Sequence, residues 1–181
     1  MMETLRLRAM VLASMFGAAT AAGAYLMIPL SPVPITLQSL FLNLAAAFLG
    51  GSWAAFSQII YILLGVLGLP VFAGGKAGLG TLLGPTGGYL FGFILAGFVA
   101  GKFIEIKKNP GLPWMIFSMA IGLLLIYALG ILQLMAVARI PLEKALLLGV
   151  LPFLPGDFLK ILAASLLARR LRPHLPWGEK E

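Results

Sequence analysis

Two ionisable residues inside an apolar stretch, Asp157 and Lys160, carry the clearest chemical signal in this chain. They lie about midway between Lys144 and Arg169, in the sequence PFLPGDFLK. Ionisable groups at membrane depth are costly, so they usually face a cavity or each other. A spacing of three residues places both side chains on one face of a helix. The pair therefore predicts a polar ligand that donates a hydrogen bond to Asp157 and accepts one from Lys160.

A purely structural explanation of this pair stays open. Pro155 and Gly156 interrupt the apolar segment, and Asp is a preferred N-cap residue. Asp157 would then start a helix and be satisfied by Lys160 alone. An interrupted membrane helix is also a recurring feature of transporter binding sites, and the two roles are compatible.

A glycine-rich segment from Pro70 to Gly92 is the second candidate site, because it holds eight of the chain's 22 glycines. Glycine lets the backbone approach a ligand closely, and irregular backbone at membrane depth survives only where it is buried in protein or lines a cavity. Its only charge is Lys76, which either meets an anionic ligand group or lies among lipid headgroups. The run GGKA lacks the GxxxxGK[ST] pattern of an ATPase phosphate loop.

Three further polar residues are candidates for the same site. Thr36 and Gln38 follow the proline-rich run PLSPVP and are expected near the outer surface, where they either contact a ligand or bond between helices. Tyr89 either lines the site or is an interfacial aromatic residue.

Small residues recur at every fourth position of the first apolar segment: Ala9, Ala13, Gly17 and Ala21. Such a stripe lets two helices approach closely. It is expected either to pack within this chain or, at Ala9 and Ala13, to dock another membrane subunit.

Composition sets the class of protein that must position these residues. Of the 181 residues, 61% are hydrophobic and only 10% are charged, against roughly 25% charged in soluble domains. We therefore expect an all-α, multi-pass membrane protein that forms a single domain over residues 1–181. The chain has no cysteine and one histidine, His174, so we expect no disulfide and no metal site. The net charge of +7 is attributed to topology rather than to nucleic acid binding.

Six transmembrane helices of about 20 apolar residues are expected. They are placed near residues 9–28, 36–49, 53–69, 86–104, 114–138 and 142–168, with outer loops at 29–35, 70–85 and 139–155. Nine of the 13 Lys and Arg residues then fall on the side of the termini. The positive-inside rule predicts that both termini are cytoplasmic, in a cell membrane.

Three segments resemble those of a known family when they are taken together: SPVPITLQSLF, GLPVFAGGKAGLGTLLGPTGGYLFGF and PFLPGDFLK. In this order, among six spans, they resemble the BioY family, the biotin-binding S components of energy-coupling factor (ECF) transporters. The resemblance extends from about Arg8 to Ala168.

The resemblance implies a six-helix S-component bundle that holds biotin near its outer surface, under the first and third outer loops. Asp157 and Lys160 would contact the ligand. The backbone of Gly74–Gly80 would close over it, which makes Gly74, Gly75 and Gly78 candidate ligand-binding positions. Thr36, Gln38 and Tyr89 would lie nearby.

The resemblance also implies partners. Ala9 and Ala13 match the alanine motif by which S components meet a transmembrane coupling subunit, which two cytoplasmic ATPases drive. ATP would be used by those subunits, and this chain is expected to need no cofactor and to be no enzyme.

Other functions remain open from the sequence. The same positions would serve an S component for another vitamin, such as thiamine or riboflavin. A membrane scaffold without a ligand fits the Asp157–Lys160 pair poorly. A membrane enzyme is disfavoured because the chain has no cysteine, one peripheral histidine and one deep acid.

Overall fold

The computed structural model describes residues 2–174 and shows a mostly helical chain. Residues 1 and 175–181, which the single-domain prediction includes, lie outside the described part. The helices and strands are α1 (Met2–Tyr25), β1 (Met27–Ile28), β2 (Ile35–Thr36), α2 (Gln38–Leu49), α3 (Gly51–Val66), α4 (Leu79–Leu83), α5 (Gly87–Glu105), α6 (Leu112–Ala138), α7 (Leu142–Gly149), α8 (Leu154–Leu171) and the 3-10 turn η1 (Arg172–His174).

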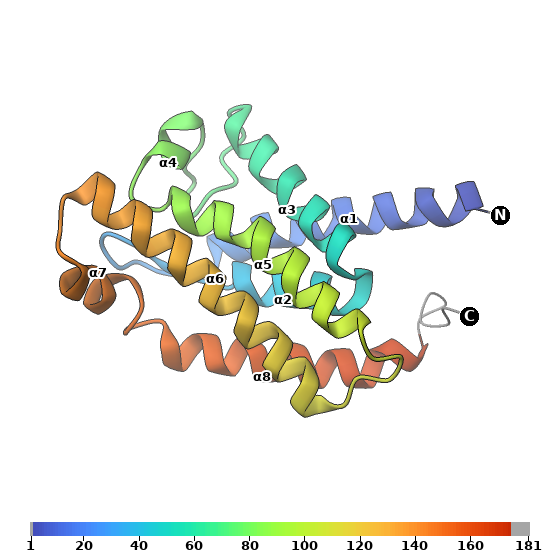
Figure 1. The fold of residues 1–181 in the computed structure, drawn as a ribbon. Helices are drawn as coiled ribbons and strands as arrows, with labels where there is room; N and C mark the ends of the chain where they lie inside the picture. The colour runs from blue at the N-terminus through green and yellow to red at the C-terminus, as the bar shows by residue number, and fades with distance from the viewer. Residues whose placement is uncertain (1, 175–181) are drawn as a thin grey trace.

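The long helices run lengthwise through the molecule (Figure 1). α1 begins and α8 ends at the same end of the bundle, which we call the terminal end. The opposite end, which we call the loop end, is formed by the β1–β2 hairpin, by the connection between α3 and α5 (residues 67–86) and by α7 (Figure 1).

Fewer than six of the described helices have, each by itself, the length and hydropathy of a full membrane span. Among the described residues, three helices are long and apolar enough to cross a membrane: Arg6–Tyr25 of α1, α5 and α6. α7 and α8 meet at an angle of 51° and add a fourth span if the bent pair is counted as one. α2 and α3 are apolar but have only 12 and 16 residues.

Several predicted boundaries are corrected. The helix expected from residue 36 starts at Gln38, because Ile35 and Thr36 pair with Met27 and Ile28 as an antiparallel ribbon. The helix expected over 53–69 is α3, which starts directly after Gly50; a φ of +80° lets this glycine reverse the chain within one residue. The expected loop 70–85 contains the short helix α4.

Small residues let α5 and α6 pack closely. A Cβ atom at Gly92 would lie 2.7 Å from the backbone of Ile126, and one at Gly88 would lie 2.2 Å from the Leu129 carbonyl oxygen. The stripe on α1 also packs inside the bundle in part: Ala13 is fully buried, while Ala9 is partly exposed.

We expect Gly88→Ala to destabilise the bundle, because the new methyl group would force α5 away from α6 at a cost of about 1–3 kcal/mol. The matched control is Gly80→Ala, since no atom lies within 4 Å of a Cβ at Gly80. Thermal denaturation of both variants in detergent measures the difference. Equal melting temperatures for the two variants would show that the α5–α6 contact does not require glycine at position 88.

Candidate functional site

A cavity of about 90 Å³ lies among the helix ends at the loop end of the bundle. One buried water needs only roughly 10–15 Å³, so the space suits a small molecule. Its polar lining comes from the hairpin, four helices and the α3–α5 connection: Thr36, Gln38, Ser39, Lys76, Thr81, Thr86, Tyr89, Tyr127, Asp157 and Lys160. Its apolar wall includes Phe72, Leu90, Phe93, Ile126 and Phe153.

The cavity gathers five of the eight ligand-binding positions predicted from the sequence. These are Thr36, Gln38, Tyr89, Asp157 and Lys160. The three glycines, Gly74, Gly75 and Gly78, are not among its lining residues, but their neighbours Phe72, Ala73 and Lys76 are.

The first turn of α8 places Asp157. The helix begins at Leu154 and its N-cap is Phe153. The purely structural explanation, in which Asp157 is the N-cap, is therefore wrong. Proline is tolerated in a first helical turn because its missing N–H would have no helical partner there. Pro155 therefore starts α8 rather than ending the preceding helix. The backbone N–H of Asp157 donates to the Phe153 carbonyl oxygen at 2.8 Å, as expected inside a helix, while its carboxylate bonds to side chains and lines the cavity.

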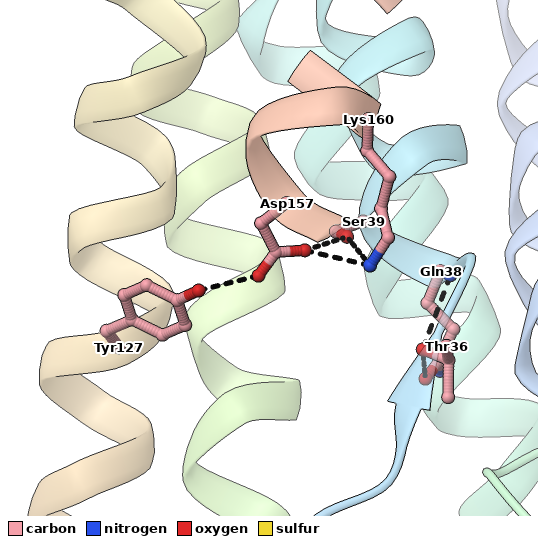
Figure 2. Close-up of polar contacts among 6 residues, drawn as sticks. All are labelled: Thr36, Gln38, Ser39, Tyr127, Asp157 and Lys160. Atoms are coloured by element: carbon pink, nitrogen blue, oxygen red, sulfur yellow. Dashed lines mark hydrogen bonds and ion pairs between the residues drawn. The ribbon is translucent and has the colours of Figure 1, made fainter. Parts of the chain in front are cut away.

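Three helices converge on the Asp157 carboxylate (Figure 2). Its Oδ2 accepts a hydrogen bond from the Tyr127 hydroxyl at 2.7 Å. Its Oδ1 accepts from Lys160 Nζ at 2.8 Å and from Ser39 Oγ at 3.1 Å. Lys160 Nζ also donates to Ser39 Oγ at 3.3 Å. We call these four residues the carboxylate cluster.

Burial makes these bonds necessary. Asp157 is 6% exposed and Lys160 is 8% exposed. Taking two charges out of water is offset only when geometry is good and further hydrogen bonds satisfy the remaining atoms. Ser39 and Tyr127 supply those bonds, and the sequence analysis missed both. Two features of the sequence could have pointed to them. Tyr127 places a hydroxyl in the middle of the longest apolar helix, and Ser39 is next to the candidate residue Gln38.

A second polar chain holds the edge of the cavity next to the hairpin. The Thr36 hydroxyl donates to Gln38 Oε1 at 2.8 Å (Figure 2), and Gln38 Nε2 donates to the hydroxyl of Tyr61 in α3. The Tyr61 ring meets Phe72 edge-on, with centroids 5.6 Å apart. The chain thus links the hairpin, through α2 and α3, to the residues that line the cavity from the α3–α5 connection.

Glycines shape that connection rather than line the cavity. Gly74 and Gly75 have φ near +75° and +71°, values that disfavour side chains. They close a tight turn in which the Phe72 N–H donates to the Lys76 carbonyl oxygen at 3.0 Å. Gly78, with φ +83°, donates its N–H to the Gly65 carbonyl oxygen of α3 at 2.7 Å.

α6 and α7 fix the rest of the loop end. Gln133 Nε2, from α6, donates to the carbonyl oxygens of Leu82 and Gly84 at 2.6 and 2.8 Å, which holds α4 in place. The Tyr89 hydroxyl donates to the Gly149 carbonyl oxygen at 2.9 Å, at the end of α7. Tyr89 therefore lines the cavity with its ring, while its hydroxyl proton is already donated to Gly149.

Lys76 is the exposed cation of the cavity wall. The described part of the chain has two ion pairs, Lys102–Glu105 and Lys160–Asp157, and neither includes Lys76. The site therefore has a neutral, buried ion pair at its inner end and a positive charge in its exposed part. No group of three or more His, Cys, Asp or Glu side chains that would suit a metal ion occurs among the described residues.

Comparison with known proteins gives similarity over nearly the whole chain. The chain is 43% identical over 166 residues to a biotin transporter BioY of Thermotoga maritima, covering 92% of this chain and 96% of that protein. It is 41% identical over 162 residues to a probable biotin transporter BioY of Pyrococcus horikoshii, covering 89% and 94%. Its relatives are named transporters and not enzymes.

The fold shows the same relationship. A crystal structure of the S component for biotin from an ECF-type ABC transporter superimposes with a TM-score of 0.87 at 28% identity, covering 96% of this chain and 95% of that one. The family model for BioY matches residues 1–177. With both the sequence and the bundle matched almost from end to end, this chain belongs to the BioY family.

Proposed function

We propose that this protein is the biotin-binding S component of an ECF-type vitamin transporter and that the cavity at the loop end receives the vitamin. The observation that carries the proposal is the buried Asp157–Lys160 pair, which opens onto a mostly apolar cavity in a chain whose relatives are named biotin transporters. Thr36, Gln38 and Tyr89 line the same cavity and complete the proposed site.

The free hydrogen-bonding capacity of the carboxylate cluster suits a urea group. A carboxylate accepts about four hydrogen bonds and an ammonium donates three. Asp157 accepts three within the cluster, and Lys160 donates two. One acceptor position and one donor therefore remain, three residues apart on the same helix. The ureido ring of biotin offers an N–H and a carbonyl oxygen side by side, which match them.

The remaining walls set the direction of the ligand. Phe72, Phe93 and the Tyr89 ring are suited to the apolar bicycle of biotin. A second carboxylate beside Asp157 would be repelled, so the neutral ureido group occupies the inner end. The carboxylate tail then extends toward Lys76 in the exposed part of the cavity.

The turn at Gly74 and Gly75 contributes to the proposed site through its backbone shape. Gly74, Gly75 and Gly78 let residues 72–76 fold tightly over the cavity, so their role is to shape the cover rather than to present side chains. An S component for thiamine or riboflavin remains the alternative, because the same cavity would then hold a different ring. A scaffold without a ligand is the further alternative.

In the membrane, we propose six crossings with both termini in the cytoplasm and the loop end outside. The short helices α2 and α3 cross where the hairpin and residues 67–78 extend their loop ends. Exposed apolar side chains such as Leu63, Leu124 and Leu132 face lipid. A transmembrane coupling subunit would dock near Ala9, at the terminal end of α1, and two cytoplasmic ATPases would supply the energy for transport. Ala13 is buried in the isolated bundle, so it reaches a partner only if α1 moves.

Calorimetric titration of the purified protein with biotin, and with thiamine and riboflavin in parallel, tests the substrate. We expect stoichiometric binding of biotin alone. Asp157→Asn should weaken biotin binding by about 10- to 150-fold, because a hydrogen bond to a charged group contributes roughly 1.5–3 kcal/mol. The matched control is Glu143→Gln, an exposed carboxylate on α7. Binding of a different vitamin would overturn the substrate, and unchanged binding by Asp157→Asn would overturn the role of the pair.

Lys76→Ala should weaken binding of biotin by about two- to fivefold, as expected for a partly solvated ion pair, and the loss should shrink at high salt. Binding of the neutral amide of biotin should be insensitive to the substitution. Lys144→Ala, which removes an exposed lysine of α7, is the control. An equal loss for the acid and the amide would show that Lys76 does not meet the carboxylate.

Single cysteines test the orientation, because the chain has no natural cysteine. Lys144→Cys at the loop end should react with a membrane-impermeant maleimide in intact cells. Lys108→Cys, in the connection between α5 and α6, should react only after the membrane is permeabilised. The opposite labelling pattern would contradict an outward-facing loop end.

A further inference from the structure

We infer that Tyr127 is a positioning residue for ligand binding: its hydroxyl fixes the second oxygen of the Asp157 carboxylate, so that the remaining acceptor position of this carboxylate faces the cavity. The inference rests on the proposed function and adds to it a residue of α6, a helix from which the sequence analysis took no site residue. Tyr127 would act through Asp157 and not through a direct bond to the ligand.

The two oxygens of Asp157 are held unequally. Oδ1 accepts from two donors, Ser39 and Lys160, whereas Oδ2 accepts from Tyr127 alone among the described residues. The torsion that turns a carboxylate about its Cβ–Cγ bond is broad and has no strong preference of its own. With Tyr127 absent, only the bonds to Oδ1 would restrain this torsion, so the whole carboxylate plane, with both of its oxygens, would turn over a wider range.

The Tyr127–Asp157 bond has the features of a strong restraint. Its oxygen–oxygen distance of 2.7 Å falls within the range of charge-assisted hydroxyl–carboxylate bonds. Tyr127 is 8% exposed and belongs to the main apolar core, so little water competes with Asp157 for its proton. Figure 2 shows the tyrosine approaching the carboxylate from the side opposite Ser39 and Lys160, so the three donors clamp the group between them.

The same cavity contains a matched tyrosine that lacks this contact. Tyr89 is equally buried and also lines the cavity, but its hydroxyl donates to the Gly149 carbonyl oxygen. Removal of either hydroxyl deletes one buried hydrogen bond. Only the change at Tyr127 should depend on whether position 157 carries a carboxylate.

A double-mutant cycle on the full-length protein tests this dependence. Tyr127→Phe is expected to weaken biotin binding about tenfold in the wild-type background and less than about twofold in the Asp157→Asn background, because its effect passes through the carboxylate. Tyr89→Phe is expected to have the same effect in both backgrounds. Equal effects of Tyr127→Phe in both backgrounds would overturn the inference, since the hydroxyl would then act on packing or on the ligand directly.

Infrared spectroscopy supplies a second measurement that needs no ligand. The carboxylate stretch of Asp157 is assigned by its loss in Asp157→Asn. It should shift in Tyr127→Phe and stay in place in Tyr89→Phe. An unshifted band in Tyr127→Phe would overturn the contact itself. A different outcome separates the two proposals. If the band shifts in Tyr127→Phe but the wild-type protein binds no biotin, the proposed function is overturned, and the ligand role of Tyr127 with it.

Discussion

The burial of one ion pair in an apolar bundle constrains much of the structure around it. Asp157 and Lys160 are almost excluded from solvent, and an unpaired charge there would cost several kcal/mol. Their partners come from helices far apart in the sequence: Ser39 from α2 and Tyr127 from α6. α2, α6 and α8 are therefore tied together at one depth by polar contacts, while the rest of their surfaces pack through apolar side chains. The cavity lies where these ties hold the helix ends around it.

The loop end depends on a different constraint, which is the need to satisfy backbone groups where helices stop. The α3–α5 connection meets it with bonds to its neighbours: Gly78 donates to α3, and the carbonyl groups of Leu82 and Gly84 accept from Gln133. Within the connection, residues 72–76 bond to one another. The part of the connection that lines the cavity is thus bonded to the bundle, and its turn depends on Gly74 and Gly75 at positive φ.

Composition and hydropathy were enough to predict a helical membrane protein, and the cost of a buried charge was enough to select Asp157 and Lys160. Both rest on local properties of the sequence. The sequence did not reveal that α8 begins at Leu154, because a Pro-Gly pair is read equally well as a break or as a first turn. It also did not reveal Ser39 and Tyr127. These residues lie 118 and 30 positions before Asp157 in the chain, and only the fold brings them into contact with it. Gly74, Gly75 and Gly78, predicted as ligand-binding positions, are absent from the cavity lining, and the first two make the turn between Phe72 and Lys76, which do line it.

The carboxylate cluster is nearly complete before any ligand arrives. Asp157 and Lys160 have most of their hydrogen bonds made by protein atoms, so an unoccupied cavity leaves few groups in want of a partner. A carrier has to exist empty for part of every cycle, and in this arrangement the buried charges would keep their protein partners during that part. In the proposed complex, recognition would be left to the two bonds that the cluster does not make for itself, and selectivity would depend on shape and hydrogen-bond order more than on charge.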